Sequence, residues 1–267
     1  MSFIVQKNHI FGRRAKFKII IQKEMASLGK YSKGFITDIP ADLTAEEYLY
    51  YKERLFKYPM EGIYIYSFEK GRMIYTDGWE SVSGIPDKEV TMLGIVNMTS
   101  PDFAPFVNEL NDKALKFLHQ RNDRLKEYSF TIEIKIRDRS GRDIPLVARV
   151  GVFDVFPDGT LKSIIGRFQV DYGLRFGKIM RFSAYGPEKD AFENDLNENL
   201  FYPFRISDKE LEVLRYLSQG LAYKEIAEKT GVSVSGIEKR IKPLFDRFNV
   251  KNNASLVAFA FENKLLP

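Results

Sequence analysis

Few side chains in this sequence have the types and spacings that could perform catalysis. The 267 residues include two histidines, His9 and His119, and no cysteine. Disulfides, cysteine-ligated zinc, iron–sulfur clusters and thiol catalysis are thereby excluded, and a Ser-His-Asp triad or a histidine-rich metal site has almost nothing to draw on. The chain also lacks a Gly-x-Gly-x-x-Gly or Gly-Lys-Ser/Thr sequence that would hold a phosphate. We therefore expect no enzyme activity, no catalytic or metal site and no cofactor.

A local group of carboxylates comes nearest to acid–base chemistry. Its members are Asp77, Glu80, Asp87 and Glu89. Paired carboxylates can exchange protons with a substrate. These four, however, fall where helices are predicted to start, and acidic side chains there cap free N–H groups and complement the helix dipole. We interpret the group as structural.

The charge of the chain favours an anionic partner, because its formal net charge is +5 and its pI is about 9.1. Residues 1–45 form a basic N-terminal extension. Its first 35 residues hold Arg13, Arg14 and six lysines against one acidic residue, Glu24. Such an arm could contact DNA phosphates, but we favour the interpretation that it is a solvated extension.

The elements that must position these residues change in character along the chain. The middle, about 58–172, is predicted to be mixed α+β. Apolar and polar residues alternate with period two over 130–137, and turn sequences follow at 139–142 and 157–160, which predicts three antiparallel strands over 128–171 joined by tight turns. A helix over 44–56, with a capping box from Thr44 and Glu47, is predicted before them. The polar, acidic residues 186–203 are predicted to be an interdomain linker.

The periodicity becomes helical from Ile206 onward. Ser207 and Glu210 fit the capping box of a first helix, and Gly220 fits the left-handed residue that ends it. Residues 224–229 fit a second, short helix.

A tight turn at 230–232 leads to a third helix capped by Ser233, and Asn253 is predicted to cap a fourth helix. The third helix is predicted to bury an apolar stripe made of Ile237, Ile241, Leu244, Phe245 and Phe248. Helix, short helix, tight turn and helix is a helix-turn-helix arrangement.

Residues 206–266 resemble the LuxR/FixJ-type DNA-binding domain without a gap. The resemblance begins at Ile206-Ser-Asp-Lys-Glu210 and continues through Gly231-Val-Ser-Val-Ser-Gly-Ile-Glu238. It implies that the third helix enters the major groove of double-stranded DNA and that the fourth helix packs at a dimer interface. We assign residues 204–267 to this domain.

The resemblance also implies which residues contact DNA. Phosphate contacts are expected from Lys224, Arg240 and Lys251, and base contacts from Ser235, Glu238, Lys239 and Lys242. The family has lysine at the position of Glu238, which can accept a hydrogen bond from cytosine N4 but repels phosphates. Pro243 removes an N–H from the third helix and is predicted to kink it or to end its straight part near Lys242.

Residues 74–94 resemble the start of a PAS sensor domain, with Asp77, Gly84, Glu89 and Gly94 at the family's positions. The three predicted strands of 128–171 match its second half, and we assign residues 46–185 to a PAS-like domain. The resemblance implies binding of a small ligand or cofactor, or a role as a dimerising scaffold. Flavin photochemistry of the cysteinyl type is excluded, because the chain has no cysteine.

A ligand of the PAS-like domain would need residues to hold it. Haem would need an axial ligand, and we interpret the one candidate, His119, as an exposed histidine at a helix end. A set of aromatic residues with polar tips could line a small-molecule cavity or could simply fill a core: Tyr64, Tyr66, Tyr75, Trp79, Phe130 and Phe168.

These patterns predict an α+β chain, in which a PAS-like antiparallel sheet with flanking helices is linked to an all-α four-helix helix-turn-helix domain. The predicted function is a cytoplasmic transcription regulator that binds double-stranded DNA as a homodimer and has no membrane segment. A small-molecule ligand in the PAS-like domain stays open. The alternative is a signalling or interaction protein whose helix-turn-helix domain has lost specific DNA readout, which Glu238 and Pro243 favour.

Overall fold

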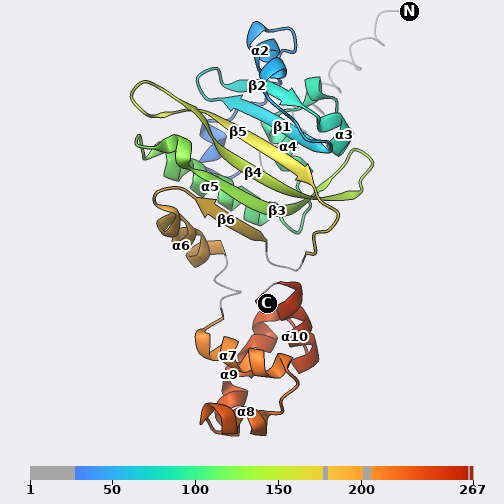
Figure 1. The fold of residues 1–267 in the computed structure, drawn as a ribbon, viewed down its shortest axis with the longest axis vertical. Helices are drawn as coiled ribbons and strands as arrows, with labels where there is room; N and C mark the ends of the chain where they lie inside the picture. The colour runs from blue at the N-terminus through green and yellow to red at the C-terminus, as the bar shows by residue number, and fades with distance from the viewer. Residues whose placement is uncertain (1–27, 177–179, 201–205, 264, 267) are drawn as a thin grey trace, which may run out of the picture. The chain divides into compact units, whose positions relative to one another are not determined.

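The computed structural model describes residues 28–176, 180–200, 206–263 and 265–266. The chain divides into two units (Figure 1). The first unit reaches Leu174 and resumes over Arg181–Asn194, and the second contains Arg175–Met180 and Asp195–Pro267. Of the basic residues in the predicted N-terminal extension, those within residues 1–27 lie outside the described residues, whereas Lys30 and Lys33 lie inside them.

The first unit is built on a six-stranded sheet in the order β2-β1-β5-β4-β3-β6, and all of its strand pairs are antiparallel. The strands are β1 Glu61–Ser67, β2 Arg72–Asp77, β3 Ser129–Arg137, β4 Asp143–Val155, β5 Leu161–Val170 and β6 Arg181–Tyr185. The predicted meander is confirmed as β3, β4 and β5, in which Ile132 pairs with Ala148 and Ala148 with Phe168. Alternate residues of β3 are buried, as period two requires.

Helices cover both faces of this sheet. Helices α4 Met92–Met98 and α5 Ala104–His119 lie on the face that carries Phe130, and α2 Glu46–Arg54 packs on the opposite face against β2. The Tyr48 hydroxyl donates to the Thr76 carbonyl over 3.0 Å, and Lys52 pairs with Asp77 at 2.7 Å. The remaining short helices are α3 Trp79–Ser83 and the 3₁₀ turns η1 Ser32–Gly34, η2 Asp87–Glu89 and η3 Leu125–Glu127.

Two of the four carboxylates of residues 77–89, Asp77 and Asp87, serve this packing, whereas Glu80 and Glu89 are exposed. The Asp87 carboxylate accepts the backbone N–H groups of Gly78 (3.2 Å) and Trp79 (2.8 Å), which are free at the start of α3. Asp77 is buried and pairs with Lys52 and with Lys57, at 3.3 Å. These contacts support the structural interpretation.

Two local predictions differ from the structure, and one strand was not predicted. Ala45 precedes α2 without a side-chain cap, because the Thr44 hydroxyl donates to Asp42 at 2.7 Å instead of capping the helix. Residues 186–203, predicted as a linker, contain helix α6 Lys189–Leu200, and Phe192 of this helix is buried in the first unit. Strand β6 was not predicted.

The second unit is a four-helix domain with helices α7 Asp208–Ser218, α8 Tyr223–Thr230, α9 Val234–Phe248 and α10 Asn253–Glu262. Its core joins apolar side chains from all four helices, among them Leu214, Ile226, Ile241 and Leu256. The α+β class, with a PAS-like sheet followed by a helical domain, is thus confirmed. Within the described ranges, none of the helices combines the length and hydropathy needed to cross a bilayer.

Candidate nucleic-acid interface and ligand cavity

Local capping signals place the helices of the second unit. The Ser207 hydroxyl accepts the Glu210 backbone N–H at 3.3 Å, and the Glu210 carboxylate accepts the Ser207 N–H at 2.8 Å, so the predicted capping box is confirmed. Gly220 has a left-handed φ of 85° after α7, and Ser233 caps α9 through the Gly236 N–H. Gly220 thus separates α7 from the short helix α8, and Ser233 marks the start of α9.

The cap of α10 differs by one residue from its prediction. Asn252 caps the helix by accepting the Ser255 N–H at 2.9 Å. The predicted cap, Asn253, instead accepts a hydrogen bond from the Tyr223 hydroxyl at 2.8 Å. This contact fastens the start of α8 to the start of α10.

Helix α9 has one buried and one exposed face. Ile237, Ile241, Leu244 and Phe248 are at most 2 % exposed, whereas Phe245 is only partly buried. The exposed face carries three of the predicted base-contacting residues, Ser235, Lys239 and Lys242. Their positions follow from the helical repeat, because residues four and three apart share a face. The sequence therefore presents a hydroxyl and two cations along one side of α9.

Glu238 modifies this face. Its carboxylate lies 2.8 Å from Lys242 Nζ one helical turn later. The hydrogen bond and charge of Glu238 raise the pKa of Lys242. Both side chains are substantially exposed, so this i,i+4 pair contributes little to stability. It does cancel part of the positive charge that α9 offers to a phosphate.

The three predicted phosphate-contacting residues have different surroundings. Lys224 at the start of α8 and Lys251 before α10 are exposed. The Arg240 side chain is only 22 % exposed and lies 3.8 Å from the Glu212 carboxylate of α7. Arg240 thus faces α7 with most of its side chain covered, a placement that the sequence did not reveal.

Pro243 does not end α9, which continues through it to Phe248. Pro243 is exposed, while Ile241 and Leu244 on either side of it are buried. The buried stripe holds the helix together where proline removes one backbone hydrogen bond. The continuation of α9 to Phe248 agrees with the predicted extent of its buried stripe, and the kink at Pro243 stays a prediction.

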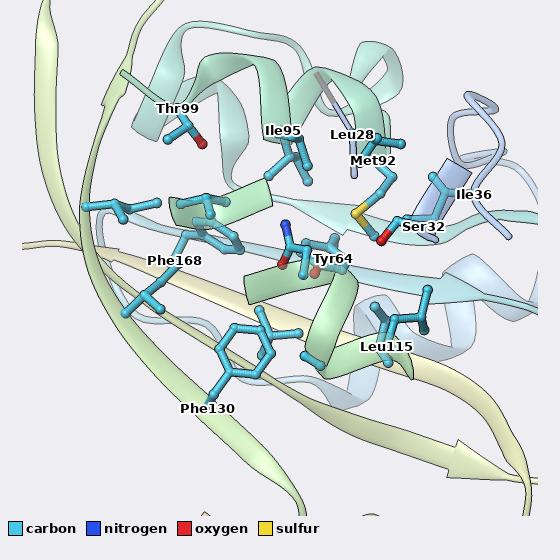
Figure 2. Close-up of a pocket in the computed structure, with 18 of the residues that line it drawn as sticks. Leu28, Ser32, Ile36, Tyr64, Met92, Ile95, Thr99, Leu115, Phe130 and Phe168 are labelled. Carbon is cyan, nitrogen blue, oxygen red and sulfur yellow. The ribbon is translucent and has the colours of Figure 1, made fainter. Parts of the chain in front are cut away.

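The first unit contains a cavity between its sheet and the helices α4 and α5 (Figure 2). The cavity has a volume of about 80 Å³. Tyr64, Phe130 and Phe168, three of the predicted lining residues, lie around it. The Tyr64 ring packs against the Phe168 ring, with centroids 5.9 Å apart, and burial raises the pKa of Tyr64.

The other three predicted lining residues do not border this cavity. Tyr75 pairs with Ile65 and faces α2 on the opposite side of the sheet, where its ring contacts Tyr48. The Tyr66 hydroxyl accepts the Thr37 N–H at 2.8 Å. Trp79 is buried against Phe168, and its indole N–H donates to the Ile63 carbonyl over 2.9 Å. Residue type predicted these aromatic residues as a group, but the strand register decides which of them face the cavity.

Sequence reasoning missed the part that residues 28–37 play at the cavity. Leu28, Ser32 and Ile36 line it, although they belong to the predicted N-terminal extension (Figure 2). The Asp112 carboxylate of α5 accepts the backbone N–H groups of Tyr31 (2.9 Å) and Ser32 (2.8 Å). We call residues 28–37 the N-terminal clasp. The three residues of the clasp that line the cavity are spaced four apart in the sequence, and this regular spacing is the signal that could have indicated their role.

The clasp also covers His119, which is therefore not the exposed histidine that was predicted. The Tyr31 hydroxyl lies 3.1 Å from His119 Nδ1. The rings of Phe35 and Phe68 pack against the imidazole, with centroids 4.5 and 5.6 Å away. Burial lowers the pKa of His119. The prediction failed because these partners are distant in sequence.

Comparison with known proteins gives a family for the second unit. The family model for bacterial regulatory proteins of the luxR family matches residues 205–260. The oxygen regulatory protein NreC of Staphylococcus carnosus is 43 % identical over 65 residues, which are 24 % of this chain and 30 % of the relative. NreC of Staphylococcus haemolyticus is 32 % identical over 102 residues, 38 % of this chain and 44 % of the relative. The chain thus spans less than half the length of these curated relatives.

Two solved structures are also similar. A phage VqmA–DPO complex is 18 % identical and has a TM-score of 0.34, with 80 % of this chain and 86 % of that chain covered. A PAS domain from Colwellia psychrerythraea is 12 % identical and has a TM-score of 0.36, with 47 % and 98 % covered. The sequence matches carry the assignment: the C-terminal domain of this chain belongs to the luxR family of bacterial regulatory proteins.

Proposed function

We propose that this chain is a DNA-binding transcription regulator in which the PAS-like unit serves as a sensory module. The carrying observation is the exposed face of α9, where Ser235, Lys239 and Lys242 stand opposite a fully buried apolar stripe in a luxR-family domain. Lys239 and Lys242 face the bases and nearby phosphates of a major groove, and Lys224 and Lys251 contact flanking phosphates. Such a regulator works in the cytoplasm, with its DNA.

The sensory part of the proposal is supported by the cavity. It lies in the core of the first unit and is lined mostly by apolar side chains, as small-molecule sites generally are. We further propose that the protein acts as a homodimer. A two-fold dimer that places α9 of each copy in successive major grooves requires half-sites about 10 bp apart.

Selection of bound sequences from a random pool of double-stranded DNA tests the proposal. The full chain is compared with the full-length double variant Lys239→Ala/Lys242→Ala, after circular dichroism has shown both to be folded. Enrichment of a repeated motif by the unaltered chain alone supports a sequence-specific regulator. Folded protein that enriches no motif contradicts it.

A second candidate function is a signalling or interaction protein without specific DNA readout. The Glu238–Lys242 ion pair favours it, because it weakens the positive charge of the face that should meet DNA. Under this alternative, the unaltered chain and the Lys239→Ala/Lys242→Ala variant bind DNA weakly and with equal affinity. Exchanging Glu238 for glutamine does not create a preferred DNA motif.

A further inference from the structure

The cavity of the first unit has a distinct chemical character. Of its 20 lining residues, 16 are apolar and none is charged. The polar ones are Ser32, Tyr64, Thr99 and Asn111. An ionic ligand would lose its hydration there without gaining a counter-ion, which is strongly unfavourable. The lining therefore selects for neutral molecules.

Among these four lining residues, Ser32 has a buried hydroxyl that the described part of the chain leaves without a hydrogen-bond partner. It is 1 % exposed, and its Oγ makes no hydrogen bond within the described part of the chain. A buried hydroxyl without a partner destabilises a folded protein. Figure 2 shows this oxygen on the cavity side of the N-terminal clasp, near Met92. A ligand atom in the cavity would supply the missing partner.

The size of the cavity limits what can fill it. Its volume is about 80 Å³, whereas a cavity that holds one water molecule needs about 10–15 Å³. The space accommodates several water molecules, or one small organic molecule of comparable bulk. Aromatic walls from Tyr64, Phe130 and Phe168 favour a flat or cyclic shape.

Resting on the proposed sensory role of this unit, we infer that the cavity binds a small, neutral, largely apolar molecule with one hydroxyl or carbonyl group, which hydrogen-bonds to Ser32 Oγ. Since Ser32 belongs to the N-terminal clasp, the ligand also stabilises the docked clasp. Asp112 holds the clasp at the neighbouring backbone N–H groups. Binding and docking are thermodynamically coupled, so each strengthens the other by the same factor.

Three probes of nearly equal size test the ligand class on the full chain. Benzyl alcohol is neutral and carries a hydroxyl, toluene lacks the hydroxyl, and benzoate is charged. Isothermal titration calorimetry should show benzyl alcohol binding about three- to ten-fold more tightly than toluene, the factor expected for one hydrogen bond. Benzoate should not bind.

Two serine variants assign the hydrogen bond. Ser32→Ala should abolish the preference for benzyl alcohol over toluene while raising the thermal midpoint of the ligand-free protein, because an unsatisfied hydroxyl is removed. Ser100→Ala is the matched control, since the Ser100 hydroxyl is also buried without a hydrogen bond within the described residues but does not line the cavity. This variant should keep the preference.

Hydrogen exchange tests the coupling to the clasp. Benzyl alcohol should slow exchange of the Tyr31 and Ser32 amides in the unaltered chain, and should do so less in Ser32→Ala. The inference is overturned if no neutral probe binds, if toluene or benzoate binds as tightly as benzyl alcohol, if Ser32→Ala keeps the preference, or if the clasp amides do not respond.

The test is separate from the test of DNA binding. A chain that enriches a DNA motif but shows no preference among the probes retains the proposed regulator function and loses this inference. A chain that binds benzyl alcohol through Ser32 but enriches no motif retains the ligand site and loses the DNA-binding function.

Discussion

Glu238 and Lys242 form an ion pair, 2.8 Å between carboxylate and Nζ, on the face of α9 that also presents Ser235 and Lys239. A negative charge is thereby built into the surface proposed to meet a polyanion. Glu238 contacts Lys242 directly, and in the described part of the chain no such contact joins it to Lys239, the other cation of this face. The balance between these charges can be measured.

Glu238→Gln should strengthen DNA binding. The substitution removes a charge that repels phosphates and frees Lys242 for DNA, while glutamine keeps the shape and the helix propensity of glutamate. We expect affinity for any duplex to rise about two- to five-fold at low salt, with a steeper dependence on salt. Fluorescence anisotropy across a salt series measures both quantities. Unchanged affinity would place Glu238 outside the interface.

Lys239→Ala/Lys242→Ala should weaken DNA binding at least about ten-fold. The slope of log affinity against log salt concentration should become shallower by up to about 1.8, since each lost phosphate contact reduces its magnitude by roughly 0.9. Lys209→Ala/Lys229→Ala is the matched control, because both lysines are exposed on α7 and α8 and the change in net charge is equal. If both variants lose affinity equally, only total charge matters and the assignment of the α9 face is wrong.

Glu210→Gln should destabilise the second unit at pH 7 by about 0.3–1 kcal/mol, because glutamine can still close the capping box but loses the charge that favours the helix start and pairs with Arg247. Burial acts to raise the pKa of Glu210, but hydrogen bonds from Ser207 and Arg247 outweigh it and lower the pKa. A carboxylate with a depressed pKa stabilises the folded state above its unfolded pKa of about 4.5, and this contribution is lost as the pH falls through the folded value. Urea unfolding followed by circular dichroism should show the variant and the unaltered chain converging on acidification.

His119 should make the first unit less stable below neutral pH. Its pKa is lowered by burial, so the folded state favours neutral imidazole. The unfolded chain gains a proton near pH 6.5, and stability therefore falls from there down to the folded pKa. His119→Phe should reduce the dependence of the thermal unfolding midpoint on pH between pH 7.5 and 5.5. Ordinary carboxylates hardly titrate in this window. A slope that is the same in both proteins would contradict the burial of His119.

The predictable parts of the fold were those with local causes. Strand β3 follows from its alternation, and β4 and β5 follow from the turn sequences that precede them. Helices α7 to α9 follow from the caps at Ser207 and Ser233 together with the helical repeat of Ile237 and Ile241. These signals depend on residues a few positions apart, so a single sequence contains them in full.

The parts that escaped prediction depend on distant partners. Strand β6 needs β3, some 50 residues earlier, to complete it. The surroundings of His119 depend on Tyr31 and Phe35, more than 80 residues away. Likewise, Tyr64 faces the cavity and Tyr75 faces α2 because of strand register, to which amino-acid type gives no guide.

Trp79 is the single tryptophan of the chain, and it is fully buried in the first unit with its ring 5.0 Å from that of Phe168, a wall of the cavity. Intrinsic indole emission therefore reports on the folding of the PAS-like unit and is blind to unfolding confined to the luxR-family domain. Because that domain is wholly helical, far-ultraviolet dichroism follows it together with the first unit. Compared along one denaturation curve, the two optical signals reveal whether the two halves of the chain melt together or in succession.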